Sequence, residues 1–130
     1  MSAELPPEAR ALLDAPEFAT VATIEPDGQP HLSVIWLGRD GDDVVFSTAR
    51  GRRKTANLER DGRATVLVYP KDNPYSYLEV RGTAVLEDDP DKALIETMSH
   101  KYLGKPYPWH NAEEERVVVR VTPSKVVFHG

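Results

Sequence analysis

Residues 43–69, DVVFSTARGRRKTANLERDGRATVLVY, decide how this chain folds. The β-prone run 44–46 predicts a strand, and residues 55–60 predict a short helix. Residues 64–69 predict a second strand, which the chain enters through the turn Asp61-Gly62. The stretch is therefore a strand, a loop, a basic helix and a strand, and the other segments are arranged around it.

Four cations gather just before that helix, in a chain of formal net charge -5: Arg50, Arg52, Arg53 and Lys54. Positive charge at a helix N-terminus is unfavourable, by a few tenths to about 1 kcal/mol per site. The arrangement is explained if the free backbone N–H groups, the hydroxyls of Ser47 and Thr48 and these cations bind an external phosphate or carboxylate. The alternative is an ordinary solvated basic face.

The composition is that of one soluble domain covering residues 1–130, with 40% hydrophobic and 28% charged residues. A pI of about 5.3 argues against general nucleic-acid binding. No apolar run approaches the roughly 20 residues of a membrane span, and the N-terminus lacks a signal pattern. Without cysteine there is no disulfide framework and no thiol nucleophile. We therefore expect a cytoplasmic protein with no membrane span.

The first third of the chain predicts a helix over residues 8–15 and strands over 18–24 and 30–37. A hairpin turn at residues 25–28 joins the two strands, since Asp27-Gly28 is a strong hairpin signal. A second hairpin at Asp40-Gly41 leads into a strand over 44–47. Three strands joined by tight turns predict an antiparallel meander.

The rest of the chain predicts a long strand over 75–86, then a helix from Asp89-Pro90 to about Leu103 that Gly104 ends. An aromatic, proline-rich loop follows at 105–111, and closing strands at 117–121 and 125–129 are separated by Pro123. Seven strands with short helices predict a small antiparallel barrel in an α+β setting.

No catalytic constellation stands out. The four histidines lack metal-ligand spacing, and His31 has an ordinary interpretation as a half-exposed strand residue. Glu79 and Arg81, on one strand face, are better explained as a structural ion pair than as an acid–base unit. Five aromatic residues either pack in the core or a dimer interface, or stack on a planar ring: Trp36, Tyr75, Tyr77, Tyr107 and Trp109. An anion site, aromatic walls and no nucleophile indicate an organic redox cofactor.

Four segments carry a family resemblance: FATVATIEPDGQPHLSVIW (18–36), FSTARGRRKTANLERDGRATVLV (46–68), NPYSYLEVRGTAVL (73–86) and KYLGKPYPW (101–109). In this order they resemble the pyridoxamine 5'-phosphate oxidase-like split β-barrel superfamily. More specifically, they resemble its branch of flavin and deazaflavin oxidoreductases that use coenzyme F-420. The first segment is common throughout the superfamily, including enzymes of flavin mononucleotide (FMN), whereas the second and third are more specific.

The resemblance implies a homodimer with a cofactor in each of two grooves at the subunit interface. It implies that Arg52 and Lys54 bind the cofactor phosphate and that the hydroxyls of Ser47 and Thr48 also contact it. It implies that the second strand lines the tricyclic ring through His31, Ser33, Val34, Ile35 and Trp36, with Asn57 as a contact from the helix. It also implies that residues of the long strand and the aromatic loop reach the partner subunit's cofactor: Tyr75, Tyr77 and Trp109.

The function that follows is an F-420-dependent reductase that transfers a hydride to a small unsaturated molecule. Arg50 and Arg53 add cations beyond what one phosphate requires, which favours the longer anion of F-420 over FMN. An FMN-dependent oxidase or reductase of the same fold is the alternative enzyme, and a non-catalytic cofactor carrier is the alternative outside enzymes. The proton donor stays open among a tyrosine, His31 and water.

Overall fold

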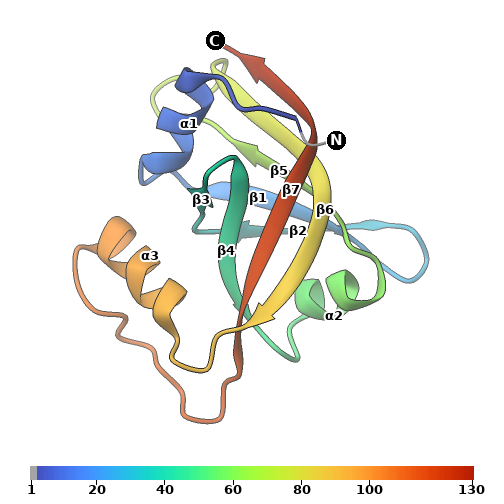
Figure 1. Cartoon of the computed structure of the whole chain (residues 1–130), viewed down its shortest axis with the longest axis vertical. Helices are drawn as coiled ribbons and strands as arrows, with labels where there is room; N and C mark the ends of the chain where they lie inside the picture. The colour runs from blue at the N-terminus through green and yellow to red at the C-terminus, as the bar shows by residue number, and fades with distance from the viewer. Residues whose placement is uncertain (1–2) are drawn as a thin grey trace.

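The computed structural model describes residues 3–130, which form seven strands and three short helices (Figure 1). The helices are α1 (Pro7–Asp14), α2 (Arg53–Arg60) and α3 (Ala93–Leu103). The strands are β1 (Ala19–Ile24), β2 (Pro30–Ile35), β3 (Gly38–Asp40), β4 (Asp43–Ala49), β5 (Arg63–Val68), β6 (Tyr77–Asp88) and β7 (Arg116–His129).

All seven strands belong to one antiparallel sheet in the order β2-β1-β5-β6-β7-β4-β3. The long strands β6 and β7 lie side by side along the molecule and join its two halves (Figure 1). Within residues 3–130 the edge strands β2 and β3 do not pair with each other, so the sheet is not closed. The predicted class, a mainly β, antiparallel split barrel with short flanking helices, is confirmed.

The predicted three-strand meander is wrong. The hairpin between β1 and β2 forms as expected, but β2 ends at Ile35 instead of running to residue 37. The hairpin at Gly41 joins the short strand β3 to β4, with Asp40 opposite Asp43. The chain therefore crosses from one edge of the sheet to the other between β2 and β3. Trp36 and Leu37 make that crossing, and Leu37 is fully buried there.

The prediction of two closing strands is also wrong, because β7 runs unbroken through Pro123. A proline is tolerated in a strand where no ladder hydrogen bond needs its missing N–H. Pairing of β7 with β4 covers Arg116 to Val121 and stops before Pro123. On the other side, a register shift between Arg81 and Gly82 places Gly82 opposite Pro123. The bulge therefore accommodates the proline.

The core lies between the curled sheet, α1 and α2. Its fully buried large side chains come from every part of the barrel: Phe46, Leu13, Leu37, Leu78, Val21, Val44, Val66, Val68, Val80, Val117, Val119 and Val121. Helix α3 starts later than predicted, since both carboxylate oxygens of Asp89 accept backbone N–H bonds, from Ala93 and Leu94. It ends at Gly104 in the left-handed conformation, as predicted. No helix in residues 3–130 is long and apolar enough to cross a membrane.

Candidate functional site

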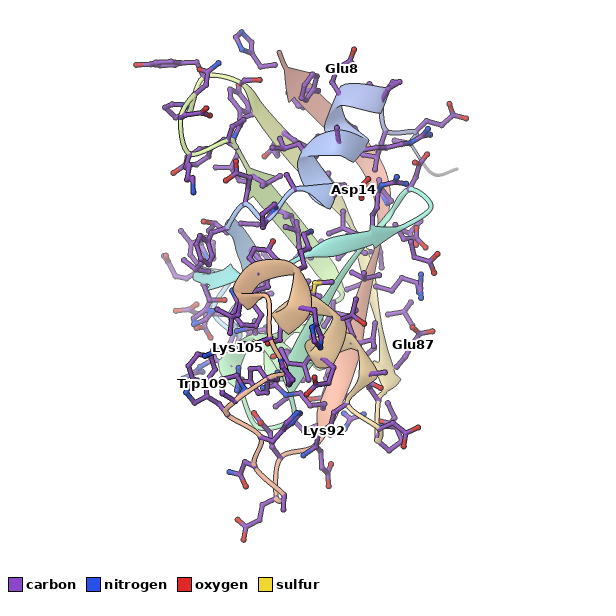
Figure 2. The ribbon with its side chains drawn as sticks, turned by 90° about the vertical axis from the view of Figure 1, so that its left-hand side faces the viewer. Glu8, Asp14, Glu87, Lys92, Lys105 and Trp109 are labelled. Carbon is purple, nitrogen blue, oxygen red and sulfur yellow. The ribbon has the colours of Figure 1, made fainter. Side chains whose placement is uncertain are left out.

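A cavity of about 220 Å³ opens between the barrel, the start of α2, helix α3 and the loop that follows α3. Figure 2 shows this side of the molecule, with α3 in front and the loop from Lys105 to Trp109 beside it. The lining combines cationic, apolar and aromatic side chains, and the Arg116 guanidinium lies 5.4 Å from the centroid of the Tyr107 ring. Its lining residues are Phe18, Val34, Ile35, Trp36, Ser47, Arg52, Lys54, Ile95, Met98, Tyr107, Trp109 and Arg116.

The turn between β4 and α2 positions two of the cations that line the cavity, Arg52 and Lys54. Gly51 has a φ of 91°, which lets the chain reverse at the end of β4 without side-chain strain. The Thr55 hydroxyl donates to the Ala49 carbonyl at 2.7 Å and ties the first turn of the helix to the strand. Arg52 is the N-cap residue, makes no side-chain capping bond, and is followed by no acidic residue in the first turn. The helix predicted over residues 55–60 is present and starts two residues earlier, at Arg53, so that Arg53 and Lys54 belong to its first turn.

Lys54 is a half-buried cation beside two guanidinium groups. Burial lowers the pKa of its amine from the ordinary 10.5, and the charges of Arg52 and Arg116 lower it further. Within residues 3–130 no carboxylate lies within 4.0 Å of its nitrogen, whereas Arg52 pairs with Glu114 at 2.7 Å. A desolvated cation among cations is unfavourable, and a bound anion would relieve it.

Arg116 also reaches this cavity, although the sequence analysis did not identify it. It opens β7 and is 4% exposed, so its charge is withdrawn from water. Its guanidinium donates to the Tyr107 hydroxyl at 3.1 Å and to Glu114 at 3.3 Å. The only sequence signal was one arginine between an acidic run and an apolar run, EEERVVV. That pattern is equally typical of a charged strand end.

Aromatic side chains also line the cavity. Trp36 stacks on Tyr102 of α3 with ring centroids 5.3 Å apart and an interplanar angle of 10°. Tyr107 meets the Trp36 ring edge-on at 6.3 Å, and Trp109 packs against Tyr107 at 5.7 Å. The Tyr102 hydroxyl donates to the Glu17 carbonyl at 2.7 Å, which fixes α3 against the barrel. Trp36, Tyr107 and Trp109 therefore form an aromatic wall whose neighbouring rings meet edge-on, and Tyr102 supports one face of Trp36.

The structure brings seven of the predicted site residues into this one cavity: Val34, Ile35, Trp36, Ser47, Arg52, Lys54 and Trp109. They come from β2, its exit, β4, α2 and the loop after α3. Residues far apart in the sequence thus converge on one cavity, which brings the cations together with Trp36 and Trp109.

Two predicted contacts lie in the interior instead. The Thr48 side chain is buried, and its hydroxyl is 3.1 Å from that of Thr55. Asn57 is 1% exposed and donates to the Thr23 hydroxyl at 3.0 Å, which joins α2 to β1. Both side chains connect the helix to the sheet, whereas Ser47, on the opposite face of β4 from Thr48, lines the cavity.

Arg50 and Arg53 are paired with carboxylates. Arg50 contacts Asp88 at 2.6 Å, Glu59 at 3.1 Å and Glu115 at 3.8 Å. Arg53 contacts Glu25 at 3.3 Å. The expected preference for the longer anion of F-420 depends on Arg50 and Arg53 as free cations. These ion pairs therefore weaken the case for F-420 over FMN.

The remaining predicted residues lie along two strands. Tyr77 stacks on His129 at 5.6 Å where β6 begins, and Tyr75 just before it is 79% exposed. On β2, the side chains of His31 and Ser33 point to the same face as Ile35, which lines the cavity. Their buried atoms His31 Nδ1 and Ser33 Oγ have no hydrogen-bond partner in the described part of the chain. Glu79 and Arg81 form the expected ion pair, at 3.2 Å.

Together the open antiparallel sheet and its flanking helices define a split-barrel protein, and its cavity is lined by cations and aromatic side chains. The chain matches the family model described as pyridoxamine 5'-phosphate oxidase over residues 5–130. It belongs to that family.

Solved structures extend the comparison. The chain is 30% identical to an F420 reductase, with a TM-score of 0.86 and coverage of 95% of this chain and 98% of the other. It is 25% identical to the conserved hypothetical protein Rv2991 from Mycobacterium tuberculosis, with a TM-score of 0.76 and coverage of 96% and 84%. General stress protein 26 from Bacillus anthracis, at 19% identity, TM-score 0.67 and coverage of 92% and 88%, shows the fold alone.

Proposed function

We propose that this protein is an oxidoreductase that binds coenzyme F-420 and uses it to reduce a small unsaturated molecule. The supporting observation is one cavity that is lined both by cations and by aromatic rings. It occurs in a chain that is 30% identical to an F420 reductase over nearly its whole length. One fold hosts many activities, so the fold alone does not support a function. The cavity supports the binding of a planar, anionic cofactor, and the similarity to an F420 reductase favours F-420 over FMN.

The residues present fit such a cofactor. Arg52 and Lys54 would bind its phosphate, with Ser47 donating a hydrogen bond from the neighbouring strand. Trp36 and Trp109 would pack against the ring. The unpartnered atoms of His31 and Ser33 are buried polar groups of the kind that the polar edge of a deazaflavin or flavin would satisfy.

The chemistry divides between cofactor and protein. Reduced F-420 supplies a hydride for an electron-poor double bond or imine, and a proton from water or a side chain completes the reduction. The protein would position the substrate with reacting atoms about 3–3.5 Å apart. The wall of Trp36 and Tyr107 would exclude water from one side, and the Lys54 and Arg52 charges would anchor the cofactor at the other.

The test is a side-by-side titration with F-420 and with FMN, followed by an assay of reduced F-420 with enones, quinones and tetrapyrroles. We expect tighter binding of F-420 and oxidation of reduced F-420 by at least one substrate class. Tighter binding of FMN would favour an FMN-dependent enzyme of the same fold. Binding of F-420 without turnover of any acceptor would favour a cofactor carrier.

We further propose that two copies of the chain build the complete site. The cavity of about 220 Å³ falls below the roughly 300–1,000 Å³ typical of ligand pockets, so one chain encloses part of a tricyclic cofactor. Beside it, one face of β2, β1 and β5 exposes apolar side chains: Leu32, Val34, Leu67 and Tyr69, with Phe18 at its end. A cluster of exposed apolar side chains next to an incomplete cavity fits a second copy, whose Tyr75 and Tyr77 are candidates to complete the site.

The expected result is a dimer in light scattering at micromolar concentration. Leu32→Glu should shift the mass toward a monomer and weaken cofactor binding, because a charge would then be buried in the interface. Val85→Glu is the matched control, since Val85 is 57% exposed on β6, away from this face. A wild-type chain of monomeric mass would contradict the proposal.

A further inference from the structure

Arg116 has donor capacity that its neighbours do not use. Its guanidinium makes contacts of 3.1 Å to Tyr107, 3.3 Å to Glu114 and 3.5 Å to Ser47 within the described residues. Charge-assisted hydrogen bonds usually measure about 2.7–2.9 Å. A guanidinium also carries more N–H groups than these contacts use. A buried charge held this loosely is costly unless another acceptor is supplied.

The other cations lie around the same point. Glu114 bridges the two guanidiniums, at 2.7 Å from Arg52 and 3.3 Å from Arg116. Lys54 is close enough to both arginines for their charges to lower its pKa, after the larger effect of burial. Glu114 does not line the cavity that contains Lys54; it lines a neighbouring cavity with Arg50 and Lys92, and Arg116 lies between the two cavities because it lines both.

We propose that Arg116 is a third ligand for the anion, acting with Arg52 and Lys54 on one phosphoryl group. The inference rests on the proposed function, because it takes the cofactor phosphate as the natural occupant. Glu114 is the counter-ion of Arg52 and Arg116 but not of Lys54, so the three cations and this one carboxylate leave a formal excess of two positive charges. That excess matches a phosphate of charge about −1.5 to −2 better than a single carboxylate. Ser47, on β4 and 3.5 Å from the Arg116 guanidinium, would add a neutral hydrogen-bond donor to the same phosphoryl group.

The inference can be tested with inorganic phosphate, independently of F-420. Phosphate is titrated at pH 8 and constant ionic strength, with binding followed by NMR and by thermal unfolding. The double variant Arg116→Met with Glu114→Gln removes the guanidinium and conserves net charge. We expect phosphate affinity to fall about tenfold, as for the loss of a hydrogen bond to a charged group. Thermal stabilisation by phosphate should shrink accordingly.

The matched control lies on the same strand. Arg120 pairs with Glu87 at 3.3 Å on β7 and β6, away from the cavity. Arg120→Met with Glu87→Gln makes the same two substitutions in type and charge, and should leave phosphate affinity unchanged. In the wild-type protein, phosphate should shift the Nε–H resonance of Arg116 and leave that of Arg120 in place. That measurement needs no variant, so it tests the inference even if the first double variant does not fold.

Three outcomes separate the inference from the proposed function. If the Arg116 variant is less stable but binds phosphate as tightly as wild type, Arg116 only holds Tyr107 and its loop, and the inference fails. If its Nε–H resonance does not respond to phosphate, the inference also fails. If phosphate binding depends on Arg116 but F-420 does not bind, the role of Arg116 in the anion site is supported and the proposal that the protein uses F-420 is contradicted.

Discussion

Replacing Arg52 and Lys54 together by alanine should weaken F-420 binding at least tenfold, as measured by fluorescence titration. Both side chains line the cavity, and each would form a charge-assisted contact worth about 1.5–3 kcal/mol to a phosphate. The partial exposure of Arg52 places its contribution at the low end of that range. The loss should be smaller at high salt, because screening weakens the wild-type interaction.

The matched control removes the same charge from the same segment. Arg50→Ala with Arg53→Ala also deletes two cations, but neither of these side chains lines the cavity. A localised anion site predicts a much smaller effect for this pair. Equal losses in the two double variants would instead indicate a diffuse basic face, the alternative that the sequence left open.

Folding stability should not confound this comparison. The pKa of Lys54 is lower in the folded protein than the ordinary 10.5 of an exposed lysine. The unfolded chain therefore holds this proton more tightly, and the charged amine opposes folding at neutral pH. That opposition fades as the pH rises through the lowered pKa toward 10.5. Removing the Lys54 charge should accordingly leave the protein at least as stable in this respect, so weaker binding would report on the site.

Local patterns explain what could be predicted from the sequence. The turn at Asp27-Gly28, the helix end at Gly104 and the start of α2 near Arg52 depend on neighbouring residues, and all three are present. Arg52, Lys54 and Ser47 lie within eight positions of one another and line one cavity. Periodicity and turn chemistry act over such distances, so they are visible in the sequence.

Features that depend on contacts between residues far apart in the sequence could not be predicted from local patterns. The crossing from β2 to β3 is set by sheet pairing and by burial of Leu37, not by the turn at Gly41. The neutralisation of Arg50 by Asp88 joins residues 38 positions apart. Arg116 enters the cavity because β7 pairs with β4, which places it opposite Ala49. None of these has a local signal.

Among the glycines, Gly82 at the bulge between β6 and β7 has the least room for an added methyl group. A Cβ added at Gly82 would lie 2.2 Å from the carbonyl oxygen of Thr122 and 2.9 Å from its carbonyl carbon. Both are backbone atoms, so no side-chain rotation can relieve the clash. The strands would have to separate where β7 passes through Pro123, between the two halves of the sheet.

Gly82→Ala should therefore destabilise the protein by about 3 kcal/mol, at the upper end of typical overpacking costs. For a domain of this size that corresponds to a fall in Tm of about 10 °C. Gly38→Ala is the matched control, because its added Cβ would meet the terminal methyl of Met98 at 3.0 Å, and that flexible side chain can move. The measurement is thermal and denaturant unfolding of both variants. A Gly82→Ala protein as stable as Gly38→Ala would mean that the two strands separate at little cost, and that close packing at Gly82 does not hold the halves of the barrel together.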